Sequence, residues 1–356
     1  MKYRSEEILS GPDNAFYRAI FKSMGYSDDE LTGRPMIGIA NSWNTLVPGH
    51  YNLNQVAQYV KNGIYRGGGT PVEFWVIAAC DAVAQGHLGM KYILPSREII
   101  CNSIEIEARA HKLDAIVMLA SCDKIIPAML MAAARLDIPA IIVNGGPMLG
   151  GKVFDGRKTD LTSVDEATGM LHAGKISSEE FSKLENVVAP GCGSCAFLGT
   201  ANTMCCITEA MGMSLTGSAL VPATYAERLR VAYESGRKIC ELAEKGITAR
   251  QIITDRSLKN GIKVAMGICG STNSVLHLSA VAYEAGMKLN VVDAFEELNK
   301  VTPQVAKVNP AAKWDMEAFY RAGGIPRVME RLGEILDLDV MTCTGQTLRE
   351  NLKNYQ

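Results

Sequence analysis

The sequence predicts an α/β fold, a layered and mostly parallel β-sheet covered by helices and followed by a helix-rich second half. Short apolar runs alternate with helical patterns through residues 1–150, which is typical of strands that are covered on both faces. Helical periodicity dominates after Phe197. The chain has 356 residues, enough to enclose a large core.

Four apolar runs are the expected strands of this sheet. They lie at Pro35–Ala40, Glu73–Ala79, Ala115–Ala120 and Pro139–Val143. A helical stretch at Ile126–Leu136 joins the last two runs into a βαβ unit. Apolar residues recur at helical spacing after Ser96, so we expect an amphipathic helix there with Ser96 as its N-cap.

Residues 149–189 are polar and punctuated by glycine, with helical pieces that start near Ser163 and after Ser177. We interpret this segment as an excursion that joins possible sub-lobes at 1–148 and 190–356. The clearest helical patterns beyond it are Ala201–Met211, Thr224–Glu244 and Ser274–Met287. The runs Lys263–Ile268 and Asn290–Val292 are candidates for additional strands.

Composition and charge exclude several classes of function. Lys and Arg number 36 and Asp and Glu 38, a net charge of −2, so no broad basic surface for nucleic acid is expected. No apolar run reaches the ~18 residues of a membrane span, and the polar start does not resemble a signal peptide. We therefore expect a cytoplasmic protein, whose ten cysteines would bind metal, act in redox chemistry or pack as apolar groups.

Candidate site residues follow the predicted strands. Ligands of open α/β sheets bind beyond the carboxyl ends of the strands, and this rule selects Asn41–Trp43, Cys80–Asp81 and Ser121–Lys124. Cys80 and Cys122 are each followed by an aspartate. Because thiolates suit iron–sulfur clusters and carboxylates suit magnesium or manganese, the repeated pair predicts a cluster beside a hard divalent ion.

These residues have simpler interpretations as well. A cysteine can be a small buried apolar group, which we expect for Cys101, Cys205, Cys206, Cys240 and Cys343. Cys192 and Cys195 lie in a glycine-rich loop and resemble a thioredoxin-like redox pair, but no clear strand precedes them, and no second CxxC supports zinc. Lys124 is either a lysine that a neighbouring metal deprotonates and leaves open to modification, or a solvated cation that opens the next helix.

Other polar groups carry weaker signals. The segment Gly267–Asn273 enters a helix whose amides and hydroxyls can hold a carboxylate or phosphate, although its spacing is not that of a P-loop. His50 and His87 fall in candidate site loops, whereas His277 is expected to be a satisfied core residue.

A series of segments in one order spans nearly the whole chain. They are Asn41–His50, Cys80–His87, Leu94–Glu98, Cys122–Lys124, Gly145–Met148, Cys192–Cys195 with Thr200–Met204, Gly270–Asn273 and Arg321–Gly324. Together they resemble the dihydroxy-acid dehydratase and phosphogluconate dehydratase family.

The resemblance implies an iron–sulfur lyase that removes water from a 2,3-dihydroxy carboxylate and yields a 2-oxo acid through an enol. A cluster iron would act as Lewis acid on the C3 hydroxyl, and Mg²⁺ would bind the carboxylate and the C2 oxygen. Carried onto this sequence, the resemblance implies Cys122 and Cys195 as cluster ligands. It likewise implies Asp81, Asp123 and Lys124 as the magnesium site. In the resembled family the lysine can be carbamylated, which would make Lys124 an oxygen ligand.

The third cluster ligand departs from the family pattern. Members with a 2Fe-2S cluster have a cysteine where this chain has Gly49. We expect Cys80 to be the third ligand, with Cys192 as second choice, and either a 2Fe-2S or a 4Fe-4S cluster.

The resembled family continues into a C-terminal domain that supplies the catalytic serine base and a glutamate ligand for magnesium. This chain ends soon after Thr342–Thr347. We therefore expect residues 1–356 to form a single large N-terminal dehydratase domain, with the family's C-terminal domain absent. The resemblance also implies a homodimer, and an incomplete site predicts a separate C-terminal partner chain.

The motifs Val47–His50 and Gly145–Met148 resemble the branch that acts in valine and isoleucine biosynthesis. One alternative is a sugar-acid dehydratase such as one acting on 6-phosphogluconate. A phosphorylated substrate requires Arg or Lys near the cleft, and only Lys91, Arg97 and Lys124 lie next to the motifs. The other alternative is a non-catalytic, cluster-binding subunit or fragment that requires a C-terminal partner.

Overall fold

A four-stranded parallel sheet organises the first half of the chain, in a computed structural model that describes residues 2–355. The strands are β1 (Met36–Asn41), β2 (Thr70–Trp75), β3 (Ala115–Leu119) and β4 (Ala140–Val143), in the order β2-β1-β3-β4. All residues of β1, β3 and β4 are buried, as expected for strands covered on both faces. The predicted α/β fold is confirmed.

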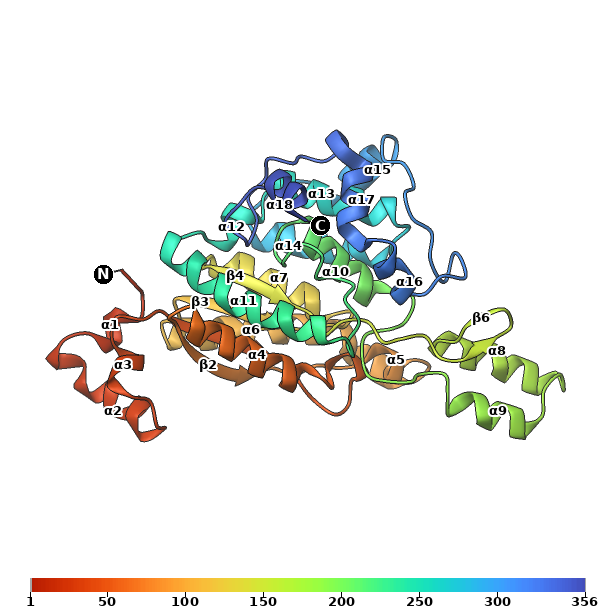
Figure 1. Ribbon diagram of the computed structural model, residues 1–356, viewed down its shortest axis with the longest axis horizontal. Helices are drawn as coiled ribbons and strands as arrows, with labels where there is room; N and C mark the ends of the chain where they lie inside the picture. The colour runs from red at the N-terminus through yellow and green to blue at the C-terminus, as the bar shows by residue number, and fades with distance from the viewer. Residues whose placement is uncertain (1, 356) are drawn as a thin grey trace.

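Helices cover both faces of the sheet because the connections between parallel strands are right-handed. The connection from β1 to β2 runs toward one edge and places α4 (Leu53–Arg66) on one face, where α11 (Ala226–Lys245) packs beside it. The later connections run toward the other edge and place α6 (Ile93–Ala110) and α7 (Ile125–Leu136) on the opposite face. Figure 1 shows this arrangement, with α4 and α11 in front of the sheet.

The second half of the described chain is helical. Its central helix is α10 (Thr200–Ala210), every residue of which is buried. Around it lie α13 (Asp255–Gly267), α14 (Asn273–Glu284) and α17 (Gly324–Leu332). Other helices of this half are α12 (Ala249–Ile252), α15 (Val291–Asn299), α16 (Met316–Arg321) and α18 (Leu348–Asn354). The first half also contains α1 (Glu6–Leu9), α2 (Ala15–Ser23), α3 (Asp28–Leu31) and α5 (Asp81–Ala84). Short 3₁₀ turns lie at Pro12–Asn14, Pro48–His50, Leu88–Tyr92 and Gly333–Ile335.

The polar segment after β4 projects from the body (Figure 1). It consists of a small hairpin, β5 (Val153–Phe154) with β6 (Arg157–Lys158), followed by α8 (Leu161–His172) and α9 (Ser178–Glu185). Ser177 caps α9 as predicted, whereas the N-cap of α8 is Asp160 and the helix begins two residues before Ser163.

Several predicted elements are wrong. The strand predicted at Glu73–Ala79 lies at Thr70–Trp75, because its last apolar residues form the loop toward the site. The predicted N-cap Ser96 lies inside α6, where its hydroxyl donates to the carbonyl of Ile93, one turn earlier.

The two additional strands are also wrong. Lys263–Ile268 belongs to the end of α13, and Asn290 caps α15 by accepting from the amides of Val292 and Asp293. Short apolar runs cannot distinguish a strand from one face of a buried helix, and here tertiary packing decides. No helix within residues 2–355 is both long and apolar enough to cross a membrane.

Candidate functional site

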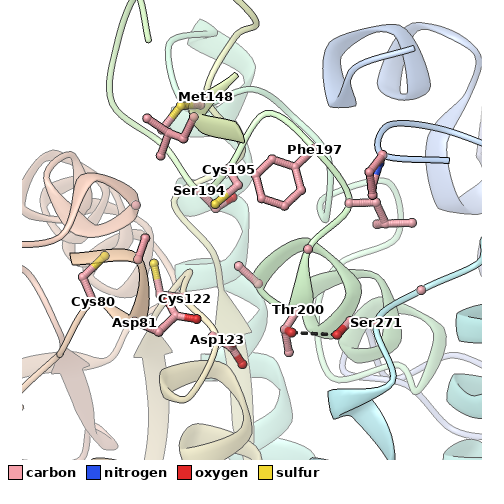
Figure 2. Close-up of a pocket in the computed structure, with 18 of the residues that line it drawn as sticks. Cys80, Asp81, Cys122, Asp123, Met148, Ser194, Cys195, Phe197, Thr200 and Ser271 are labelled. Atoms are coloured by element: carbon pink, nitrogen blue, oxygen red, sulfur yellow. Dashed lines mark hydrogen bonds between the residues drawn. The ribbon is translucent and has the colours of Figure 1, made fainter. Parts of the chain in front are cut away.

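A cavity of about 530 Å³ lies where the loops after the strands meet the start of α10 (Figure 2). Its lining includes residues of both predicted Cys-Asp pairs, the glycine-rich loop and the segment before α14. Among the lining residues are Gly49, Cys80, Asp81, Cys122, Asp123, Ser194, Cys195, Thr200 and Ser271. The sheet positions the two Cys-Asp pairs, because the loops that follow neighbouring parallel strands emerge at the same edge of the sheet.

Four cysteines line this cavity: the exposed Cys269, which lies before α14, and the three expected cluster ligands Cys80, Cys122 and Cys195. Cys80 precedes α5, Cys122 follows β3, and Cys195 precedes α10, and Figure 2 shows their sulfur atoms facing the same space. Burial raises the pKa of Cys122 well above its usual value, and the proximity of Cys195 and Cys80 raises it further. Burial raises the pKa of Cys195 to about 12, with Asp81 and Cys80 adding to the effect. Both thiols are therefore neutral at pH 7 unless a cation is bound beside them.

The remaining six cysteines lie outside this cavity. Cys192, the second choice for a third cluster ligand, is partly exposed and does not belong to the cavity lining. Cys101, Cys205, Cys206, Cys240 and Cys343 are buried in the core, as expected for apolar packing. All ten cysteines are free thiols.

The predicted magnesium residues form a compact charged group. Asp81 begins α5 and Asp123 precedes α7, and both line the cavity, whereas Lys124 reaches it through Asp123, with 3.1 Å between its Nζ and the Asp123 Oδ1. Burial, together with the neighbouring Asp123 carboxylate, raises the pKa of Asp81. Burial opposes ionisation of Asp123 too, but hydrogen bonds from His277, Asp81 and Lys124 outweigh it and lower the pKa of Asp123. The pair therefore holds an ionised Asp123 beside a more easily protonated Asp81.

His277 belongs to this group, although the sequence indicated only a satisfied core residue. It lies fully buried on α14, with its Nε2 3.2 Å from the Asp123 Oδ1 and its Nδ1 3.3 Å from the Arg97 Nη1. Arg97 can only donate, so Nδ1 accepts and Nε2 carries the proton that it donates to Asp123. Burial lowers the pKa of His277, consistent with this neutral form. Arg97 is fixed in turn by Glu98, whose Oε1 accepts from its Nε at 3.0 Å and its Nη2 at 2.6 Å.

His50 organises the loop that carries Cys122. Its Nδ1 lies 2.8 Å from the carbonyl oxygen of Ser42, and its Nε2 accepts from the amides of Ser121 at 3.2 Å and Cys122 at 3.1 Å. Because a carbonyl cannot donate, Nδ1 carries the proton. Complete burial lowers the pKa of His50 to about 4, so the imidazole is neutral and braces the loop at physiological pH.

The remaining predicted loops differ in their roles. Asn41–Trp43 does not line the cavity; Asn41 instead bonds to Glu73, and the Ser42 hydroxyl donates to the Leu119 carbonyl. His87 is exposed and bonds within its own loop. Gly49 lines the cavity so closely that a Cβ there would lie 2.8 Å from the Cys122 Sγ.

Hydroxyl groups at the start of α10 and just before α14 line the far side of the cavity. The hydroxyls of Thr200 and Ser271 lie 2.7 Å apart, and the Asn273 Nδ2 donates to the Thr200 Oγ1 at 3.0 Å. Figure 2 shows the Thr200–Ser271 pair opposite the cysteines. This side can orient a hydroxyl or carboxylate by neutral hydrogen bonds.

A single metal ion and an iron–sulfur cluster each require particular donor atoms from the cavity. Within residues 2–355, no three His, Cys, Asp or Glu side chains are arranged to hold one metal ion. Cys80, Cys122 and Cys195 instead surround a space, with Asp81 and Asp123 next to it (Figure 2). Such thiols fit a cluster of several irons, and the carboxylates fit a hard cation beside it.

Relatives support the resemblance found in the motifs. Residues 34–351 match the family described as dihydroxy-acid/6-phosphogluconate dehydratase N-terminal. A dihydroxy-acid dehydratase of Caldanaerobacter subterraneus is 49% identical over 356 residues, covering 99% of this chain and 63% of the relative. One of Pyrococcus furiosus is 50% identical over 353 residues, covering 99% of this chain and 64% of the relative. This chain thus spans less than two thirds of the length of either relative, and it belongs to the dihydroxy-acid/6-phosphogluconate dehydratase family.

Proposed function

We propose that this chain is the cofactor-holding N-terminal part of an enzyme that dehydrates 2,3-dihydroxy carboxylates to 2-oxo acids in valine and isoleucine biosynthesis. The observation that carries the proposal is one cavity at the carboxyl ends of a parallel sheet, where the thiols of Cys80, Cys122 and Cys195 lie beside two carboxylates, one of which pairs with a lysine. Family membership supplies the reaction class.

The proposed cofactors are an iron–sulfur cluster, of 2Fe-2S or 4Fe-4S type, and Mg²⁺. Cys80, Cys122 and Cys195 would hold the cluster, and Asp81, Asp123 and a carbamylated Lys124 would hold Mg²⁺. When bound, these groups supply Lewis acidity for loss of the hydroxyl and positive charge for the developing enolate.

The chain's own residues bind and orient the substrate. Thr200 and Ser271 offer neutral hydroxyl groups opposite the thiols, and Asn273 positions Thr200 by donating to its Oγ1. Arg97 and His277 fix the orientation of Asp123, and the Nε2 proton of His277 stays on the hydrogen bond to that carboxylate. His50 holds the Cys122 loop in place.

The lining favours a branched alkyl acid over a sugar phosphate. Met148, Leu161, Phe197 and Val308 give the cavity an apolar wall, and among residues 2–355 none of its lining side chains is Lys or Arg. A phosphate group requires charged donors that this lining does not offer. An isobutyl or sec-butyl skeleton fits such a wall.

The proposal includes a homodimer acting in the cytoplasm, with the base supplied by a C-terminal domain of the same or a separate chain. Anaerobic iron and sulfide analysis with paramagnetic resonance tests the cofactor. Cys122→Ser and Cys195→Ser should each lose most of the iron, whereas Cys343→Ser, a buried control outside the cavity, should keep it. Equal iron content in all three variants contradicts the cluster site.

Turnover tests the substrate. The chain together with its C-terminal domain should convert 2,3-dihydroxyisovalerate at least tenfold faster than 6-phosphogluconate. The reverse preference would select the sugar-acid alternative. Full turnover of 2,3-dihydroxyisovalerate by these 356 residues alone would show that no partner domain is needed, and loss of turnover only when the domain is omitted would show that one is.

A further inference from the structure

A second cavity, of about 630 Å³, lies between the segment that follows α15 and the helices α16 and α17. Its apolar lining includes Val305, Trp314, Phe319 and Val328. Its size is typical of sites for small organic molecules. It is distinct from the candidate active site, with Val308 as the one residue that lines both cavities.

Four cations surround this apolar interior: Lys307, Arg321, Arg327 and Arg331. Arg321 pairs with Glu317 at 2.8 Å and Arg327 with Glu330 at 2.6 Å, but neither glutamate belongs to the lining. Within residues 2–355, Lys307 and Arg331 take part in no ion pair, and no acidic side chain lines the cavity. The cavity therefore has an excess of positive charge around an apolar floor.

The backbone at the rim adds to this field. The motif Arg321–Gly324, which supports the family resemblance but lies outside the candidate site, forms the turn between α16 and α17. Gly323 has φ +103° and Gly324 φ +55°, conformations that favour glycine, so the chain reverses here and α17 begins in the cavity lining. No side chain caps the N-terminus of α17, whose dipole favours an anion.

We propose that this cavity binds a small amphipathic organic anion, with an aromatic or branched aliphatic group on the apolar floor and a carboxylate or phosphate held by Arg331 and Lys307. Guanidinium groups recognise both anions in bidentate fashion, which explains the placement of Arg331 at the rim. The inference stands independently of the dehydratase proposal.

The bound anion would contact a wall of the candidate active site. The amides of Val305 and Ala306 both donate to the Gly267 carbonyl, at 2.7 and 2.9 Å, and the segment then passes to Val308 between the cavities. Binding in the second cavity would therefore affect the segment that forms part of the wall of the candidate active site.

The test uses calorimetry and tryptophan fluorescence on the 356-residue chain, with phenyl phosphate and 3-phenylpropanoate as probes. At least one should bind, and the tighter of the two identifies the anionic group. Phenol and inorganic phosphate, which each lack one half of the recognition, should bind at least tenfold more weakly. Trp314→Phe should remove most of the fluorescence change and keep the calorimetric binding, because Trp314 lines the cavity.

Matched variants locate the site. The double variant Lys307→Gln, Arg331→Gln should weaken the tighter probe at least tenfold, whereas Arg66→Gln, Lys353→Gln, with the same charge change outside the cavity lining, should not. Ala322→Trp, which fills the cavity from an exposed position, should also abolish binding. Absence of binding by both probes, binding indifferent to these variants, or inorganic phosphate binding as tightly as phenyl phosphate would each overturn the proposal.

Discussion

The imidazole of His50 accepts the backbone amide of Cys122 at 3.1 Å, so a histidine in one loop fixes the thiol-bearing turn of another. The same nitrogen accepts from Ser121, and the opposite ring nitrogen donates to Ser42. The ring thus joins the loop after β1 to the loop after β3 and sets the direction in which the Cys122 side chain leaves the backbone.

Replacing this ring should loosen the turn. His50→Phe leaves buried amides at Ser121 and Cys122 without an acceptor, so the free energy of unfolding should fall by about 3 kcal/mol. Hydrogen exchange at those two amides should accelerate at least tenfold. His87→Phe, in an exposed loop, is the control and should change neither quantity. Unchanged exchange in His50→Phe would show that the imidazole does not brace the turn.

Gly49 should resist any side chain. In Gly49→Ala the new Cβ meets the Cys122 Sγ at 2.8 Å and the Ser194 backbone at 3.3 Å, so overpacking should cost about 1–3 kcal/mol in urea unfolding. Displacement of the Cys122 sulfur should also lower iron content. Gly191→Ala is a matched control, because its Cβ would make only an ordinary 3.5 Å contact with Thr224. Equal stability and iron content in the two variants would contradict this packing argument.

His277 should tune magnesium binding without affecting iron. His277→Phe removes the hydrogen bond to Asp123 and the acceptor for Arg97, and loss of such an orienting partner typically weakens metal affinity 10- to 100-fold. Magnesium titration should show this loss while iron content stays constant. Tyr283→Phe, exposed on the same helix, should match the parent protein. A parallel loss of iron would indicate general collapse of the site instead.

Glu209 should make stability depend on pH. Burial raises its pKa to about 7, although the amides of Ala219 and Gly217 donate to it and Arg228 lies nearby. A carboxyl with a raised native pKa binds its proton more tightly when folded. Its contribution is therefore complete below the unfolded pKa of 4.5 and is lost as pH rises through 7.

The shift corresponds to about 3 kcal/mol. The difference in unfolding free energy between the parent protein and Glu209→Gln should thus fall by about that amount from pH 4.5 to pH 8. A difference that stays constant, or that grows with pH, would show that the carboxyl is ionised in the native state.

The sequence predicted the cavity residues that follow the ends of strands. Cys80 and Cys122 end apolar runs, and the geometry of a parallel sheet brings such ends together whatever the details of packing. The same logic failed at Asn41–Trp43, whose polar groups are consumed by bonds to Glu73 and Leu119.

Residues brought in by tertiary contacts were harder to predict. The loop of Cys195 reaches the site through a bridge between Pro147 and Ser194, with the Met148 amide donating to the Ser194 carbonyl at 2.7 Å. His277 arrives on a helix from the second half, and one helical histidine carries no sign of its partner. The only local signal is its spacing, one turn after Asn273 on the helix that the glycine-rich segment opens.

The second half contains a helix where the sequence indicated an additional strand, and the cause is related. Lys263–Ile268 is apolar enough for a strand, but in the structure it completes α13, which packs along α10. A strand and a helix of this length can bury the same apolar residues equally well. Packing against segments distant in the sequence therefore decides which of the two forms.

The sulfur atoms of Cys80, Cys122 and Cys195 come from three distant parts of the chain, and this separation would determine when the proposed cluster can enter. Cys80 and Cys122 meet only after β1, β2 and β3 have paired, and Cys195 joins them only after the loop before α10 docks against the segment that follows β4. During synthesis no short emerging segment can capture iron with all three thiols. Loading of the proposed cluster would thus be coupled to the late, non-local steps of folding and would wait for a nearly complete domain.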